Sequence, residues 1–183
     1  EAMNTLTDSS HHLFQVTSLL TGAWLMPDDR AQNVLLNMKA EYHYMESTWR
    51  RWYGRIQFDY GKALTPDLWL TLGGEESLRG YPSNIFYADR RTLLTIERRY
   101  FTNVHWFNLI RVGGAIFLDA GRSQLSADAH ENSPWLADAG FGLRLSSSKS
   151  SSGIIVHLDL GFPLIDSGLY DAHQWTLTTK ETF

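Results

Sequence analysis

The chain has 183 residues, of which 43% are hydrophobic and 20% charged, and its formal net charge is −4. These values exclude a disordered chain and fit a single domain, and because the basic residues are scattered, we expect no nucleic-acid partner. The absence of cysteine excludes disulfides, thiolate metal sites and thiol nucleophiles.

Period-two alternation of apolar and polar residues recurs along the chain in segments of roughly ten residues, which predicts β-strands. In segment 110–119, for example, Ile116 and Leu118 fall on one face, whereas Phe117 and Asp119 fall on the other. No apolar run reaches the roughly 18 residues that a membrane helix requires, which excludes a helical membrane protein. We predict about nine strands, at 13–25, 34–44, 51–60, 68–72, 91–101, 110–119, 138–145, 154–162 and 174–183.

The predicted strands favour an all-β fold, an antiparallel transmembrane β-barrel, over a soluble β-sandwich. Sandwich strands need only about five or six residues, whereas these segments are longer and carry aromatic residues near their ends. In a barrel, the apolar face contacts lipid and the charged face lines the lumen. The links alternate in length: we expect 73–90, 121–133 and 164–172 on the extracellular side, and 63–67, 102–107 and 146–152 on the other.

The link at about 73–90 has a composition that predicts an inward-folded loop. Gly73, Gly74 and Gly80 permit backbone conformations closed to other residues, so the segment can fold back and present Arg79 to the lumen. Glu97 and Asp119 lie on the polar faces of the next two predicted strands. We predict that Arg79 pairs with Asp119, assisted by Glu97; the alternative is a loop arginine and two ordinary lumenal acids.

Other polar residues of the predicted strands carry weaker signals. Arg111, Arg144, His157 and Asp159 are interpreted as side chains of a solvated lumen. The chain has no serine-centred motif and no His-x-x-x-His pair, so we expect neither an enzyme nor a metal or cofactor site.

Three motifs, in order along the chain, resemble a known family. Arg79-Gly80-Tyr81 follows Gly73-Gly74; Glu97 lies on the next strand; and Phe117-x-Asp119-x-Gly121 lies on the one after. The chain then ends with Trp175-x-Leu177 and a final aromatic residue, Phe183, in the manner of a C-terminal insertion signal. Lys180 and Glu181 depart from that signal. Together these residues resemble the BamA/TamA family of outer-membrane proteins, which is related to the FhaC-type two-partner secretion transporters.

The resemblance implies that residues 1–183 are the C-terminal part of a sixteen-stranded barrel in the bacterial outer membrane, without the POTRA domains that precede it. It implies assembly, insertion or translocation of other proteins, with the Arg79 loop held against the barrel wall. The expected partners are outer-membrane lipids, client outer-membrane or secreted polypeptides, and POTRA domains and accessory proteins of the complete chain. For the organisation of the chain, the alternative to a fragment is a short protein that closes its barrel by dimerising. For the function, the alternative is a passive, porin-like channel.

Overall fold

The computed structural model describes residues 2–9, 11–26, 30–107, 109–126, 134–147, 154–165 and 172–181. Within these ranges no helix is long or apolar enough to cross a membrane. The elements that lie within these ranges are strands and one short 3₁₀ helix, η1: β1 Ala2–Ser9, β2 His12–Leu25, β3 Arg30–Ser47, β4 Arg50–Lys62, η1 Pro66–Leu68, β5 Leu70–Leu72, β6 Phe86–Ala88, β7 Arg90–Trp106, β8 Ile110–Gln124, β9 Leu136–Ser147, β10 Ile154–Pro163 and β11 Gln174–Glu181.

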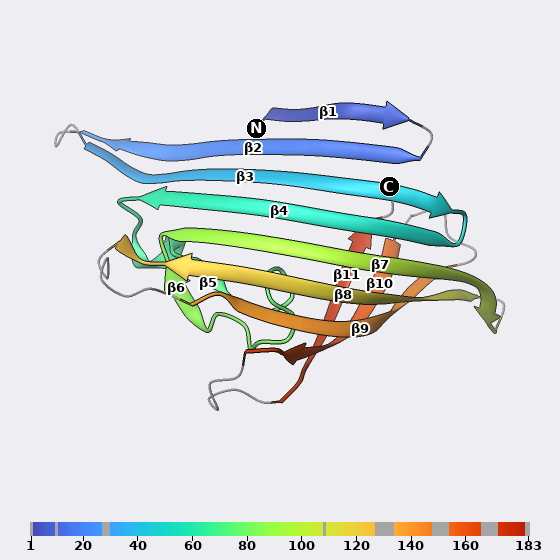
Figure 1. The fold of residues 1–183 in the computed structure, drawn as a ribbon. Coiled ribbons are helices and arrows are strands. Elements are labelled where there is room, and N and C mark those ends of the chain that lie inside the picture. The colour runs from blue at the N-terminus through green and yellow to red at the C-terminus, as the bar shows by residue number, and fades with distance from the viewer. Residues whose placement is uncertain are drawn as a thin grey trace.

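Nine strands form one curved antiparallel sheet in the order β1-β2-β3-β4-β7-β8-β9-β10-β11 (Figure 1). Each strand pairs with its neighbour in the chain, except that β4 pairs with β7 across the intervening segment 63–89. That segment contains the second sheet, in which β5 pairs with β6. The meander places both edges of the nine-stranded sheet at the ends of the described chain.

The structure confirms the number of strands in the main sheet and corrects its membership. The segment predicted at 68–72 is not a wall strand, because Leu70 and Leu72 are both buried in the β5–β6 segment. Its place is taken by β1, whose polar sequence gave no alternation signal. Because 63–89 is one connection, the prediction that 63–67 lies on the side opposite 73–90 is wrong. The predicted link 102–107 is largely strand, since β7 continues past a register shift between Phe101 and His105.

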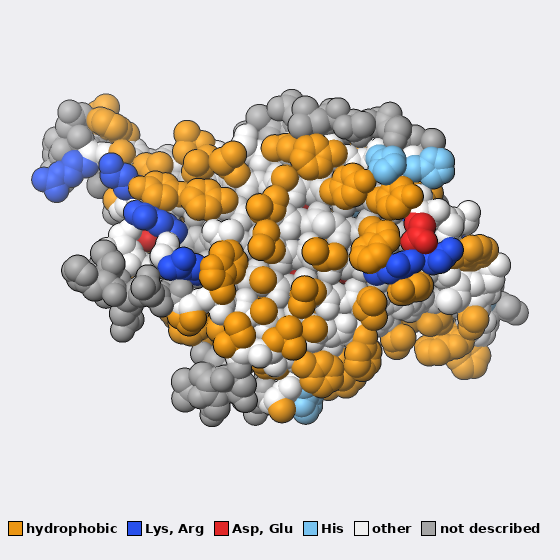
Figure 2. Space-filling model, viewed as in Figure 1, with side chains coloured by type: hydrophobic (Ala, Val, Ile, Leu, Met, Phe, Trp, Pro, Cys, Tyr) orange, Lys and Arg blue, Asp and Glu red, His pale blue; other side chains and the backbone are white. Residues whose placement is uncertain are grey.

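The main sheet exposes its apolar face and buries its charged face, which is the reverse of the arrangement in a water-soluble protein. On the outer face, Ile56, Ile96 and Ile116 are 52%, 55% and 53% exposed. On the inner face, the acids Glu97 and Asp119 are 3% and 1% exposed. Figure 2 shows hydrophobic side chains spread across the outer face. An apolar surface of this kind marks contact with a membrane or with another protein.

The segment between β4 and β7 folds against the inner face and supplies the hydrophobic core. This core consists of Leu72, Leu78 and Tyr81 from the segment together with Leu93 of β7 and Leu136 of β9, and Ile85 packs against it. The segment is therefore packed against the wall, which positions Arg79 at the acidic inner face.

Candidate functional site

A tight turn of backbone shapes the loop ahead of Arg79. Gly73 and Gly74 have φ values of +99° and +90°, which side-chain-bearing residues rarely adopt. The N–H of Gly73 donates to Ser77 Oγ at 2.8 Å, and the N–H of Gly74 lies 3.0 Å from the carbonyl oxygen of Leu78 and 3.1 Å from that of Tyr81. The two glycines thus close the turn.

Gly80 is required for a different reason from the one predicted. It does not have a positive φ; instead, it lies so close to the wall that a Cβ would be 2.6 Å from Asp138 Cβ and 3.0 Å from the backbone carbon of Phe162. From the opposite side, a Cβ on Gly161 of β10 would lie 2.6 Å from the Gly80 nitrogen. Two facing glycines therefore let the loop backbone contact the β10 backbone, and this contact brings Arg79 within reach of the wall.

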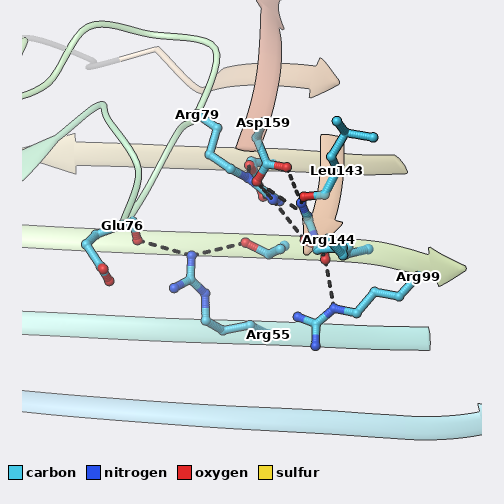
Figure 3. Close-up of polar contacts among 10 residues, drawn as sticks. Arg55, Glu76, Arg79, Arg99, Leu143, Arg144 and Asp159 are labelled. Atoms are coloured by element: carbon cyan, nitrogen blue, oxygen red, sulfur yellow. Dashed lines mark hydrogen bonds and ion pairs between the residues drawn. The ribbon is translucent and has the colours of Figure 1, made fainter. Parts of the chain in front are cut away.

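Arg79 contacts acids from three strands (Figure 3). Its Nε and Nη2 donate to the two carboxylate oxygens of Asp119 on β8, at 2.8 and 3.2 Å. Its Nη1 donates to Glu97 on β7 at 2.8 Å and to Asp159 on β10 at 3.0 Å. The guanidinium also lies 3.5 Å from the centre of the Phe117 ring. The structure thus brings the predicted residues together and adds Asp159.

Arg144 forms a second cationic centre beside Arg79. Its Nη2 donates to Glu97 at 2.9 Å, and its Nη1 pairs with Asp159, so both arginines contact the same two acids. Arg99 also donates to Glu97, at 2.7 Å. We call Arg79, Glu97, Asp119, Arg144 and Asp159 the apex cluster.

The apex cluster corrects one interpretation made from the sequence. Arg144, His157 and Asp159 are 2%, 3% and 2% exposed, so they are not side chains of a solvated lumen; Arg111 is exposed. The sequence contained a usable signal, because Arg144, His157 and Asp159 share the inward parity of neighbouring predicted strands. What it lacked was the register that places Arg144 opposite His157. Asp138 was also missed: it is fully buried next to Gly80 and pairs in register with Asp119.

The charge state of Arg79 follows from its surroundings. Burial alone would lower its pKa, but the charge and hydrogen bonds of Asp119, with the charges of Glu97 and Asp159, raise the pKa above the ordinary arginine value. Arg79 is therefore cationic at any physiological pH, and it is 7% exposed. A cation buried to this extent depends on its acidic partners, because water cannot replace them.

The neighbouring motif residues hold the loop around Arg79. The hydroxyl of Tyr81 lies 3.1 Å from the carbonyl oxygen of Ala137 and 2.8 Å from that of Ile165, so it can donate to either. Gly121 of the Phe-x-Asp-x-Gly motif faces the loop core, where a Cβ would lie 3.0 Å from a methyl carbon of Leu72. Phe117 and Asp119 of that motif therefore contact Arg79, and Gly121 leaves room for Leu72 and Leu78 of the loop.

A second attachment, which the sequence did not predict, holds the base of the loop. Arg91 Nε donates to Asp59 Oδ2 at 2.8 Å, and Arg91 Nη1 donates to the carbonyl oxygen of Thr71 at 2.6 Å. Asp59 also accepts hydrogen bonds from Asn37 and from Gln57. We call Asp59, Arg91 and the Thr71 carbonyl the base cluster. Between the two clusters, Arg55 donates to the carbonyl oxygen of Glu76 at 3.2 Å (Figure 3).

The remaining predicted residues lie away from the loop. Trp175 and Leu177 are 62% and 65% exposed on the outer face of β11, and Phe183 lies outside the described residues. The described part of the chain contains no group of three His, Cys, Asp or Glu side chains that could hold a metal ion.

Comparison with known proteins bears on the fold. The structure is similar to CdiB from Escherichia coli, with a TM-score of 0.69 and 16% sequence identity, over 94% of this chain and 33% of the CdiB chain. The chain therefore spans about a third of the length of CdiB. No protein-family description and no curated protein matches the sequence. The predicted fold class, an antiparallel β-barrel wall, is confirmed by this likeness.

Proposed function

We propose that this chain is the C-terminal part of an outer-membrane barrel that inserts or translocates proteins, and that the apex cluster holds its loop in the resting position. The observation that carries the proposal is the contact of Arg79 with acids from three wall strands. A loop held only to fill space would not need three buried carboxylates around one cation. Such an attachment is suited to a conformational role, because it is discrete and can be exchanged for other contacts.

Translocation is favoured over insertion within this proposal. CdiB is a two-partner secretion transporter, and the resemblance of the motifs extends to that class. The exposed apolar outer face supports placement in the outer membrane, because an aqueous compartment would not accommodate it. The alternative within the proposal is insertion, as the resemblance to the BamA/TamA family implies. The two functions differ in the fate of the client: translocation secretes a polypeptide, whereas insertion places a barrel in the membrane.

The test uses the complete protein in a bacterium that lacks its own copy of the gene. We expect wild-type protein to restore one or a few surface or secreted polypeptides, and Arg79→Gln to fail to do so while reaching the outer membrane in equal amount. The matched control is Arg55→Gln, which removes a loop contact without touching the apex cluster. Equal restoration by Arg79→Gln and wild type would contradict the role of the apex cluster.

The porin alternative predicts a different pair of results. A passive channel would restore uptake of small solutes and would alter no secreted or surface polypeptide. Planar-bilayer conductance of the same purified variants separates the two, because in the proposed transporter Arg79→Gln raises conductance while abolishing polypeptide transfer.

A further inference from the structure

On the outer face of β4, β7 and β8, the charged side chains lie in two groups, and the residues between the two groups are uncharged. Lys62, Arg90 and Arg122 lie at the end next to the long links, and Arg50 and Arg98 lie toward the short turns. Figure 2 shows basic side chains gathered at its left end, where Figure 1 places the ends of β4 and β8 and the start of β7. Along β4, about twelve residues separate the charged ends, or roughly 30 Å for a strand tilted by about 40°. The charges therefore mark two boundaries of an apolar band.

Strand register places the three cations of the first boundary next to one another. Arg90 pairs with Tyr60, which is two residues before Lys62, and Arg122 pairs with Thr92, which is two residues after Arg90. Each cation is thus a diagonal neighbour of the next on the same face, at about 7–8 Å. The guanidinium of Arg90 is supported by the Tyr60 ring, whose centre is 5.2 Å away.

The two boundaries differ in how far their charges are neutralised. At the short-turn boundary, Glu46 pairs with Arg98 at 2.7 Å and with Arg50 at 3.3 Å. At the long-link boundary, Asp89 is 4.0 Å from Arg90, and its other oxygen accepts the N–H of Ser126. Lys62 and Arg122 form no ion pair with any residue that the structure describes. Among the residues that the structure describes on this face, the long-link boundary therefore has three cations and one acid, Asp89.

We propose that Lys62, Arg90 and Arg122 bind the phosphate groups of a bis-phosphorylated glycolipid in the outer leaflet of the membrane. This inference rests on the proposed outer-membrane placement with the long links outside, but not on the role of the apex cluster. Three cations spread over about 15 Å match a headgroup with two separated phosphates better than a headgroup with one. Arginine side chains donate to phosphate in pairs, and each cation near an anionic surface strengthens binding.

The experiment measures lipid binding to the complete protein in detergent, by native mass spectrometry with bis-phosphorylated lipid A. The variant Lys62→Gln/Arg122→Gln leaves the Arg90 and Tyr60 contact in place. Its matched control, Arg50→Gln/Arg98→Gln, removes the same number of cations at the opposite boundary. We expect the first variant to weaken binding at least about tenfold and the control to weaken it less than about twofold.

Three outcomes would overturn the proposal: equal loss in both variants, undiminished binding of lipid A without its phosphates, or equally tight binding of phosphatidylglycerol. Equal thermal unfolding midpoints of the variants without lipid exclude misfolding as a cause. Lys62 and Arg122 belong to neither the apex cluster nor the base cluster, so polypeptide transfer is expected to be unchanged in Lys62→Gln/Arg122→Gln. Undiminished lipid binding in this variant, in a protein that still transfers polypeptides, would be failure of this inference alone. Weakened lipid binding in a protein whose wild type transfers no polypeptide would be failure of the proposed function alone.

Discussion

The loop between β4 and β7 is attached to the barrel wall in two places by different chemistry. At the apex cluster, the loop supplies the cation, Arg79, and the wall supplies the acids. At the base cluster, the wall supplies both Arg91 and Asp59, and the loop contributes a backbone carbonyl, that of Thr71. The base attachment therefore does not depend on a loop side chain, whereas the apex attachment depends on one residue. In the proposed function, the apex is therefore the part of the loop that can be released, and the base is the part that stays attached.

Of all the changes at the apex and base clusters, replacement of Arg79 is expected to lower the free energy of unfolding most. In Arg79→Gln, Asp119 loses its bidentate partner, and Glu97 and Asp159 keep only arginines of the wall. Because a buried charge is left unpaired, the free energy of unfolding should fall by about 3–5 kcal/mol. Urea unfolding of the complete protein in lipid vesicles measures this change. A loss below about 1 kcal/mol would indicate that lumenal water reaches the apex cluster.

Replacing Arg91 of the base cluster should lower the free energy of unfolding by less than replacing Arg79 does. In Arg91→Gln, Asp59 keeps the amides of Asn37 and Gln57, so its carboxylate is not left without donors. The lost hydrogen bonds to Asp59 and to the Thr71 carbonyl correspond to about 1.5–3 kcal/mol. The same unfolding assay ranks the two regions, and a base variant less stable than Arg79→Gln would reverse the comparison.

The apex can also be separated from the wall without changing any charge. A Cβ at Gly161 would lie 2.6 Å from the Gly80 nitrogen and 2.8 Å from the carbonyl carbon of Arg79, and backbone atoms cannot easily move aside. Gly161→Ala should therefore displace the loop apex at a cost of about 1–3 kcal/mol. Gly54→Ala is the matched control, because nothing lies within 4 Å of its Cβ position. Thiol labelling reports displacement: Ser77, which is 3% exposed, is replaced by cysteine in this cysteine-free chain.

The labelling result decides whether the backbone contact between Gly80 and Gly161 helps to hold the loop apex against the wall. We expect the thiol at position 77 to be protected in the Gly54→Ala protein and to react in the Gly161→Ala protein. Protection in both would mean that the ion pairs hold the loop even when the two glycines no longer meet.

The hydrogen bonds of Arg55, which lies between the apex and base clusters, should contribute least to the free energy of unfolding. Arg55 donates to the Glu76 carbonyl at 3.2 Å and to Thr95 Oγ1 at 3.1 Å, and Glu76 is exposed. Water can replace these hydrogen bonds, so Arg55→Gln should change the free energy of unfolding by about 0.5–1 kcal/mol. Urea unfolding detects this change, and a loss as large as that of Arg91→Gln would show that Arg55 belongs to the base cluster.

The sequence predicted those parts of the structure that depend on local pattern. Alternation identified the wall strands because side chains such as Ile116 and Phe117 fall on opposite faces of β8, whichever strand lies beside it. It failed for β1, whose residues do not alternate. It also misplaced 68–72, where apolar residues pack into the loop core rather than facing outward.

The site was predicted to the extent that its residues belong to motifs. Arg79, Glu97 and Asp119 stood out as a set, whereas Arg144 and Asp159 on β9 and β10 looked like ordinary lumenal residues. Their contribution depends on strand register and on the inward position of the loop, and single-sequence patterns do not contain either. The base cluster was missed for the same reason, because Asp59 and Arg91 meet only when β4 pairs with β7.

The central claim is that Arg79 and Asp119 act as one unit that holds the loop, and a double-mutant cycle tests it most directly. The complete protein is compared as wild type, Arg79→Gln, Asp119→Asn and the double variant, with labelling of the cysteine at position 77 and polypeptide transfer as readouts. We predict that Arg79→Gln/Asp119→Asn is no more impaired than Arg79→Gln alone, because the second change removes a carboxylate that the first has left unpaired. Additive impairment in the double variant would contradict the claim, since it would show that the two residues act independently.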